Sequence, residues 1–137
     1  MMKTKTEVLE FLQAQPMWNL ATCGNDYPNV IPLRYHNVME DGKLITCVVF
    51  TSQSIENIRI NNKVCISAFS IANGHPEGYK IYGTAEFHAD GPYAEKAMEV
   101  CAPVAEEGFV PKGGAIVIAI DKITVASPGP DNNKVVE

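Results

Sequence analysis

Apolar residues recur at helical spacing at the start of the chain and at strand spacing over most of the rest. From Val8 to Leu12, apolar residues recur every three to four positions. Thr4 and Glu7 stand in front of them at the spacing of a capping box, in which each residue satisfies a free backbone amide of the other. The pattern therefore predicts a first helix over residues 5–15.

Most later segments have the signature of β-strands. They are short, rich in β-branched and aromatic residues, and bounded by turn residues such as the Glu40-Asp41-Gly42 hairpin signal. One of them alternates strictly, which places Tyr79, Ile81 and Ala85 on one face. Short helices are expected at about 51–60 and 90–101. Strands are expected at 17–23, 29–38, 44–50, 64–69, 79–89 and 115–125.

The order of these segments predicts a mostly β domain with peripheral helices. Strands joined by short turns pair antiparallel. Six short strands in one domain favour a barrel, because closure removes exposed sheet edges. Pro32 implies an edge position or a bulge, since proline cannot donate to a neighbouring strand. We expect a single domain over residues 1–137, with 128–137 as a tail that is frayed or held by a partner.

Composition and charge limit the classes of function. The 137 residues are 46% hydrophobic and 20% charged, and the formal net charge is −5, which is typical of an ordinary folded domain. Nucleic-acid binding is not expected, because it normally needs a basic surface. No apolar run approaches the ~20 residues that span a bilayer, and no secretion signal is visible. The sequence thus predicts a cytoplasmic protein without a membrane partner.

The four cysteines do not form a metal-binding pattern. No C-x-x-C pair is present, and no histidine lies at zinc-ligand spacing from a cysteine. Reduced structural thiols are the expected state in the cytosol. No metal site, catalytic triad, P-loop or dinucleotide fingerprint is found, so catalytic residues cannot be assigned from motifs.

The segment with the most chemical content joins a strand to a helix. A buried strand runs into Thr51-Ser52-Gln53-Ser54, and these residues open the next helix. A helix N-terminus offers unpaired N–H groups and a partial positive charge, so it suits a phosphate. The same residues also serve as ordinary helix caps. Either interpretation fits this segment alone.

Four segments in this order and spacing resemble the pyridoxamine 5'-phosphate oxidase-like, FMN-binding split-barrel family. The resemblance covers about residues 8–128. The segments are Leu20-Ala21-Thr22-Cys23 before a Gly/Asn/Asp turn, Pro28-Asn29-Val30-Ile31-Pro32, Ser54-Ile55-Glu56-Asn57-Ile58, and Tyr79 to Phe87 followed by Asp90-Gly91-Pro92.

The resemblance implies a six-stranded antiparallel split barrel and a homodimer that holds FMN in a groove at the subunit interface. Many relatives have a lysine or arginine where this chain has Gln53, which removes a charge-assisted contact to phosphate. The cofactor-binding residues that the resemblance implies are Val30, Ile31, Pro32 and Leu33 along the flavin ring, Val48, Val49 and Phe50 along the cofactor, and Thr51, Gln53, Ser54 and Asn57 at the phosphate.

The implied function is a flavin-dependent oxidoreductase that acts on a small molecule. The alternatives are a flavin-storage protein without catalysis, or the same barrel with deazaflavin or haem. Arg34, Tyr35 and His36 follow the ring-lining strand, where they could meet a substrate or end in solvent. Trp18 is expected in the core rather than against the flavin, and His75 and His88 are expected in solvent.

Overall fold

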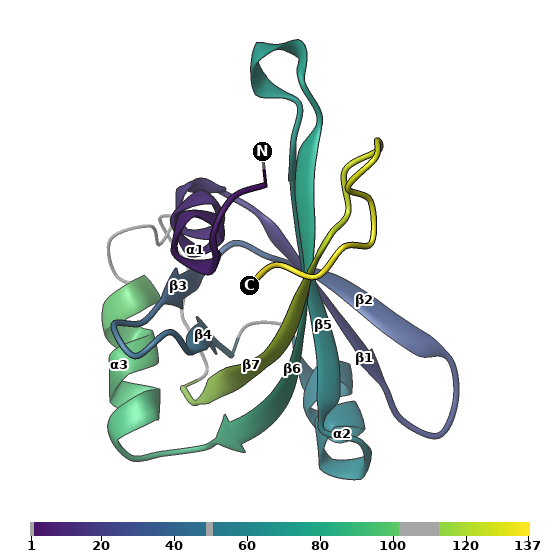
Figure 1. Ribbon diagram of the computed structural model, residues 1–137. Helices are drawn as coiled ribbons and strands as arrows, with labels where there is room; N and C mark the ends of the chain where they lie inside the picture. The colour runs from purple at the N-terminus through teal and green to yellow at the C-terminus, as the bar shows by residue number, and fades with distance from the viewer. Residues whose placement is uncertain (1, 49–50, 102–112) are drawn as a thin grey trace.

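The computed structural model describes residues 2–48, 51–101 and 113–137, and one curled antiparallel sheet dominates it (Figure 1). The helices are α1 (Lys5–Ala14), α2 (Ser52–Ile60) and α3 (Pro92–Cys101), with a short 3-10 turn η1 (Ala72–Gly74). The strands are β1 (Trp18–Cys23), β2 (Pro28–Leu33), β3 (His36–Val38), β4 (Leu44–Cys47), β5 (Lys63–Ser70), β6 (Glu77–His88) and β7 (Ala115–Val125). The expected mostly β, split-barrel fold is confirmed, with a sheet of seven strands where six were expected.

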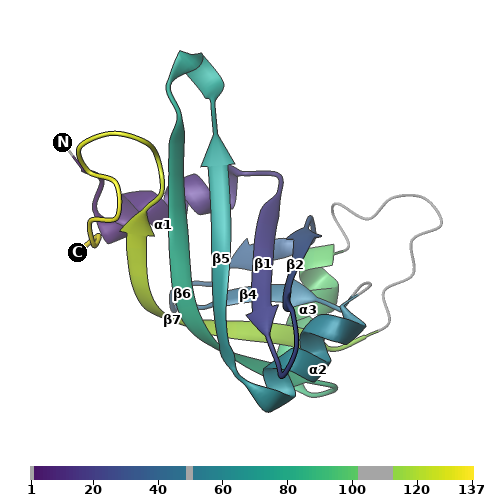
Figure 2. The same cartoon turned by 90° about the vertical axis from the view of Figure 1, so that its right-hand side faces the viewer.

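The strands of the sheet follow the order β2-β1-β5-β6-β7-β4-β3. Among the described residues, β2 and β3 are therefore the two edge strands, and the expected edge position of Pro32 is confirmed. β5 and β6 form a long hairpin whose tip projects away from the rest of the molecule (Figure 2). α2 packs against β1 and β6, whereas α3 packs against β3, β4 and β7.

The expected capping box holds the start of α1. The hydroxyl of Thr4 accepts from the Glu7 amide at 3.3 Å, and the Glu7 carboxylate accepts from the Thr4 amide at 3.0 Å. This exchange satisfies backbone donors that a helix N-terminus leaves unpaired. The helix then buries Val8 and Leu12 in the main core, as their spacing predicts.

Two expected strands end earlier than the pattern predicts. The strand expected at 29–38 is two strands, because the chain leaves the sheet at Arg34 and Tyr35 before β3 begins. The strand expected at 44–50 ends as β4 at Cys47, and residues 49–50 lie outside the described part of the chain. Apolar composition predicts both segments as continuous strands, since it carries no information about where pairing stops.

The tail after β7 is neither frayed nor left for a partner, which corrects the expectation. Val136 is buried in the main core, and its amide donates to the Ile123 carbonyl at 2.9 Å. The Val125 amide donates to the Lys134 carbonyl at 3.0 Å. The tail therefore folds back along β7 as part of the domain.

The state of the cysteines also differs from the expectation in one place. Cys47, at the end of β4, takes part in a disulfide, so the prediction that every thiol is reduced is wrong for this residue. Cys23 and Cys65 carry free thiols as expected. In the described ranges, no helix combines the length and apolar character needed to cross a membrane.

Candidate functional site

The N-terminus of α2 presents an unsatisfied hydroxyl together with free backbone amides. Thr51 occupies the N-cap position, but its side chain makes no capping hydrogen bond. The residue is 2% exposed, and within residues 2–48, 51–101 and 113–137 its buried Oγ1 atom has no hydrogen-bond partner. The first amides of a helix have no intrahelical acceptor, and Ser52 next to them is exposed. An acceptor-rich anion would satisfy both kinds of donor.

Gln53 does not point its amide freely at this site. Its Nε2 donates to Asn57 Oδ1 at 3.0 Å, one helical turn away. Asn57 is 5% exposed, and its Nδ2 donates to Thr22 Oγ1 on β1 at 3.0 Å. This chain of polar contacts satisfies a buried amide and fixes α2 on β1. Gln53 and Asn57 therefore hold the helix in place.

A second contact joins the same helix to the edge strand. Asn29 Nδ2 on β2 donates to Ser54 Oγ at 3.2 Å, and Ser54 is fully buried. Gly24 lies so close to the network that an added Cβ would stand 2.7 Å from Asn57 Oδ1. The first turn of α2 is therefore held by two strands and by the turn between them.

The predicted ring-lining residues divide between the two faces of β2. Val30 is 63% exposed and Pro32 is also exposed, whereas Ile31 is half-buried and Leu33 is buried. Alternation along a strand requires this division, so one face of β2 can offer only part of the predicted set to a ligand. Val48 is buried in the main core. Val49 and Phe50 fall outside the described residues.

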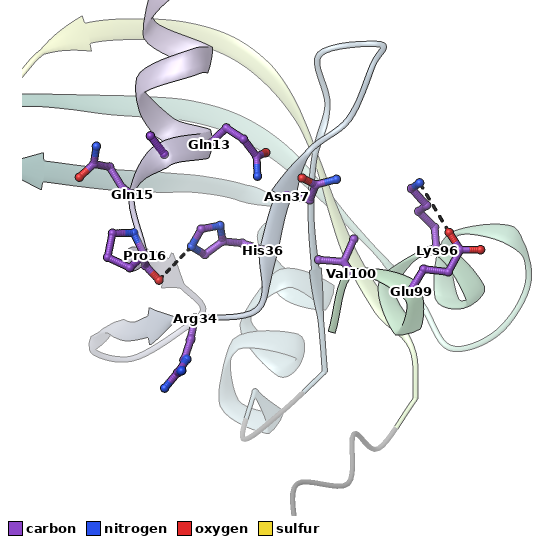
Figure 3. Close-up of a pocket in the computed structure, with 10 residues that line it drawn as sticks. Gln13, Gln15, Pro16, Arg34, His36, Asn37, Lys96, Glu99 and Val100 are labelled. Carbon is purple, nitrogen blue, oxygen red and sulfur yellow. Dashed lines mark hydrogen bonds and ion pairs between the residues drawn. The ribbon is translucent and has the colours of Figure 1, made fainter. Parts of the chain in front are cut away.

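A cavity lies beyond the far end of β2. It has a volume of about 600 Å³ and is walled by the end of α1, the segment after β2 and one face of α3 (Figure 3). Arg34 and His36 line one wall, and Lys96 and Glu99 form an ion pair of 3.6 Å on another. Arg34 follows Asn29 by five positions of largely extended chain, a span of roughly 17 Å.

His36 is held in this wall by an aromatic stack. Its ring lies 3.9 Å from the Trp18 ring, centroid to centroid. Nε2 donates to the Pro16 carbonyl at 3.4 Å, because a carbonyl can only accept, and Nδ1 is buried without a partner. Burial lowers the pKa of His36 below its ordinary 6.5, although the hydrogen bond to Pro16 opposes this effect.

The remaining aromatic and histidine candidates have structural surroundings. Trp18 is buried and its Nε1 donates to the Leu12 carbonyl at 2.9 Å, so the expectation of a core residue is confirmed. His75 is exposed as expected. His88 is only partly exposed, which corrects the expectation of a solvated side chain, and it lies 3.4 Å from the Glu86 carboxylate. Within the described residues, no group of histidine, cysteine and acidic side chains is arranged to hold a metal.

Sequence reasoning missed Thr22 and Asn29 as parts of the site. Their partners Asn57 and Ser54 lie 35 and 25 residues away along the chain, so no local pattern connects them. The one available signal was that Thr22 and Asn29 belong to the two segments, on either side of the turn at 24–26, that resemble the family. Thr51 at the N-cap and Gln53, Ser54 and Asn57 on α2 do come together at the start of this helix.

Comparison with known proteins finds a matching family model and a relative of similar sequence. The family model of pyridoxamine 5'-phosphate oxidase matches residues 4–125. Uncharacterized protein MJ0282 of Methanocaldococcus jannaschii is 32% identical over 98% of this chain and 88% of its own length.

Two crystal structures have a similar fold. HupZ of Group A Streptococcus has a TM-score of 0.75 and 25% identity, covering 96% of this chain and 98% of its own. An FMN-binding protein from Syntrophomonas wolfei has a TM-score of 0.73 and 16% identity, covering 90% and 89%. With a family model that spans most of its length, the chain belongs to the pyridoxamine 5'-phosphate oxidase family.

Proposed function

We propose that this protein binds FMN and acts as a flavin-dependent oxidoreductase on a small molecule. The observation that carries the proposal is the buried hydroxyl of Thr51 at the N-terminus of α2, which has no hydrogen-bond partner among the residues that the structure describes. Buried hydroxyls are almost always hydrogen-bonded, so an orphan at a helix N-terminus calls for an acceptor. A phosphate supplies acceptor oxygens and the negative charge that the helix dipole favours.

The rest of the cofactor fits the direction of β2. A phosphate at Thr51 would lie beside Asn29, since Asn29 contacts Ser54 in the same helical turn. The ribityl chain and ring would then extend along β2 toward the cavity at Arg34 and His36. When bound, the flavin would supply the electron or hydride transfer. The chain's own residues would bind it, orient it and shape the cavity for the substrate.

A homodimer is part of the same proposal. Val30 on the edge strand and Tyr27 in the turn before it are large, apolar and exposed. An edge strand with such side chains is a surface that a second copy could cover. The family resemblance implies a groove shared between two copies, and the proposal sets β2 beside that groove.

Equilibrium titration tests the proposal. Flavin fluorescence is followed while protein is added to FMN, and we expect saturation at about one flavin per chain. Turnover of a reduced nicotinamide with an electron acceptor would then separate the oxidoreductase from a storage protein that binds flavin without catalysis. Titration with a deazaflavin and with haem covers the two alternative cofactors. Absence of FMN binding at millimolar protein would contradict the proposal.

A further inference from the structure

We infer that this flavin site is electrically neutral at the phosphate, and that it therefore holds flavin weakly and exchangeably, with little preference for FMN over riboflavin. The inference rests on the proposed function. It concerns whether the flavin is a resident cofactor or a diffusible one that enters and leaves, and it follows from where this chain places its charges.

The first turn of α2 contains no charged side chain among Ser52, Gln53 and Ser54. The cation of this helix, Arg59, belongs to its last turn and lies over the ring of Phe87 at 5.5 Å. A rise of about 1.5 Å per residue places its backbone roughly 12 Å along the axis from Thr51. Arg59 therefore lies at the opposite end of the helix from the proposed phosphate.

The nearby surface does not supply a cation either. The shallow pocket beside Gln53 is lined by Asp26, Tyr27, Pro28 and Asn29, which adds an acidic group and no basic one. Lys63 follows the C-terminal end of α2, where it contacts Thr84 at 2.8 Å and Asp121 at 3.5 Å. In the described part of the chain, a phosphate at Thr51 thus meets neutral donors.

The amide of Gln53 cannot replace a cation. One of its two hydrogens is used in the bond to Asn57 Oδ1. Hydrogen bonds between neutral donors and a charged acceptor are weaker than those between two ions. A helix N-terminus by itself favours a surface anion by only a few-fold in affinity, by roughly a factor of five at most. The phosphate therefore adds little to the binding of the ring and ribityl chain.

The net charge of the protein is a second, independent observation that predicts weak binding of the phosphate. The chain carries a formal charge of −5, so a dianionic phosphate is repelled at long range. Added salt screens this repulsion. Without a cation at the site, FMN affinity should stay constant or increase with salt, whereas a site that contains a cation should lose affinity.

The experiment compares FMN with riboflavin by fluorescence titration at low and at ~0.5 M salt. For the wild type we expect a riboflavin-to-FMN ratio of dissociation constants below about ten, and no loss of FMN affinity with salt. Gel filtration should separate the flavin from the protein. Gln53→Lys should increase FMN affinity by about tenfold or more, leave riboflavin unchanged and introduce the usual loss with salt.

Two further variants make the comparison specific. Ile60→Lys adds the same charge at an exposed position, 56% exposed, at the other end of α2, and it should change FMN affinity by no more than about threefold. Gln53→Met breaks the bond to Asn57 without adding charge, so it separates the charge effect from a change in folding, which thermal unfolding monitors.

The possible results separate the two claims. A wild type that binds FMN more than about a hundredfold tighter than riboflavin, and loses it with salt, would overturn the exchangeable site but keep the proposed function. If neither the wild type nor Gln53→Lys binds either flavin, the proposed function fails, and this inference fails with it.

Discussion

The imidazole of His36 lies nearly parallel to the indole of Trp18, with 12° between the ring planes and 3.9 Å between the centroids. Trp18 is in turn fixed by its hydrogen bond to the Leu12 carbonyl at the end of α1. The pair connects β1, β3 and α1 at the edge of the cavity. Since Trp18 is the one tryptophan of the chain, its fluorescence reports on this stack.

The first prediction concerns pH. The pKa of His36 is lowered in the folded protein, mainly by burial. The unfolded chain therefore takes up its proton near pH 6.5, before the folded protein does, and stability falls as the pH falls from 6.5 toward the lower folded value. Chemical unfolding followed by Trp18 fluorescence at pH 5–8 measures this.

His36→Phe is the control for that measurement, because phenylalanine can stack on Trp18 but does not titrate. The difference in unfolding free energy between the wild type and the variant should depend on pH below 6.5 and be constant above it. The other two histidines are present in both proteins, so the difference isolates the effect of His36. A pH-independent difference would contradict the prediction.

The second prediction is that Thr51→Val separates binding from folding. Valine has the shape of threonine with a methyl group in place of the hydroxyl, and among the described residues Oγ1 has no partner to lose. The unfolding free energy should be unchanged or higher by up to ~1 kcal/mol, while FMN affinity falls by about fivefold or more. Thermal unfolding and flavin titration give the two values.

Thr124→Val provides a matched control for this change. Thr124 is also buried, and its hydroxyl also lacks a partner, but it lies on β7 against the C-terminal tail. The same substitution there should leave FMN affinity unaltered. Equal losses of affinity in both variants would show that Thr51 has no specific contact with the flavin.

The third prediction uses Ser52→Asp to place a negative charge at the proposed phosphate position. The acidic side chain should stabilise the helix slightly through the dipole, by ~0.3–1 kcal/mol. It should weaken FMN at least about tenfold by like-charge repulsion and leave riboflavin unchanged. Opposite signs for stability and FMN binding would be difficult to explain by misfolding.

Ser54→Asp is the less informative form of this experiment. Ser54 is fully buried and bonded to Asn29, so a carboxylate there would lose its hydration as well as repel a phosphate. We expect a large loss of stability from Ser54→Asp, and reduced FMN binding would then follow from unfolding. The exposed neighbour Ser52 avoids this ambiguity.

The fourth prediction concerns the bend in the β6–β7 pair. The register shifts between Tyr82 and Gly83, and an added Cβ at Gly83 would stand 2.5 Å from Ile118 Cγ2 and 2.6 Å from the Ala119 carbonyl. Because backbone atoms cannot yield easily, Gly83→Ala should destabilise the protein by roughly 2–3 kcal/mol. Glu86→Ala, on the exposed side of the same strand, should change it little. Chemical unfolding compares them.

The fifth prediction tests the proposed dimer. Val30→Lys places a charge on the exposed face of β2, and it should shift sedimentation at micromolar concentration from a dimer toward a monomer. Ile60→Lys, which adds the same charge away from β2, should remain a dimer. A wild type that sediments as a monomer and still binds one flavin per chain would contradict the shared groove.

The local pattern of residues predicted most of the fold. The capping box at Thr4 and Glu7, the alternation along β6 and the long β7 were all recognisable, because each depends on neighbours within a few positions. Burial of Tyr79, Ile81 and Ala85 on one face of β6 confirms the predicted alternation. The break after Leu33 was not recognisable, since the segment remains apolar while its pairing partner changes from β1 to β4.

The candidate site was predictable only in part. The hydroxyl-rich opening of α2 was found from sequence, but the commitment of Gln53 to Asn57 depends on how the helix sits on Thr22. The docked tail illustrates the same limit. Val136 is buried in the core and its amide bonds to the Ile123 carbonyl, but the polar composition of residues 131–134 gives no sign that the tail docks on β7.

The two prolines of β2 affect how this protein associates with other copies at high concentration. Pro28, Val30 and Pro32 are alternate residues of β2. In the regular register with β1, their backbone groups therefore point to the same side of the strand. Neither proline can donate to β1, so all three residues direct their backbone toward the open edge, where Val30 alone offers an N–H. Two of these three positions therefore lack the N–H that another strand would need, which disfavours extension of the sheet along this edge. A second copy is expected to approach through side chains, and the prolines help to protect the apolar edge against fibril-like growth.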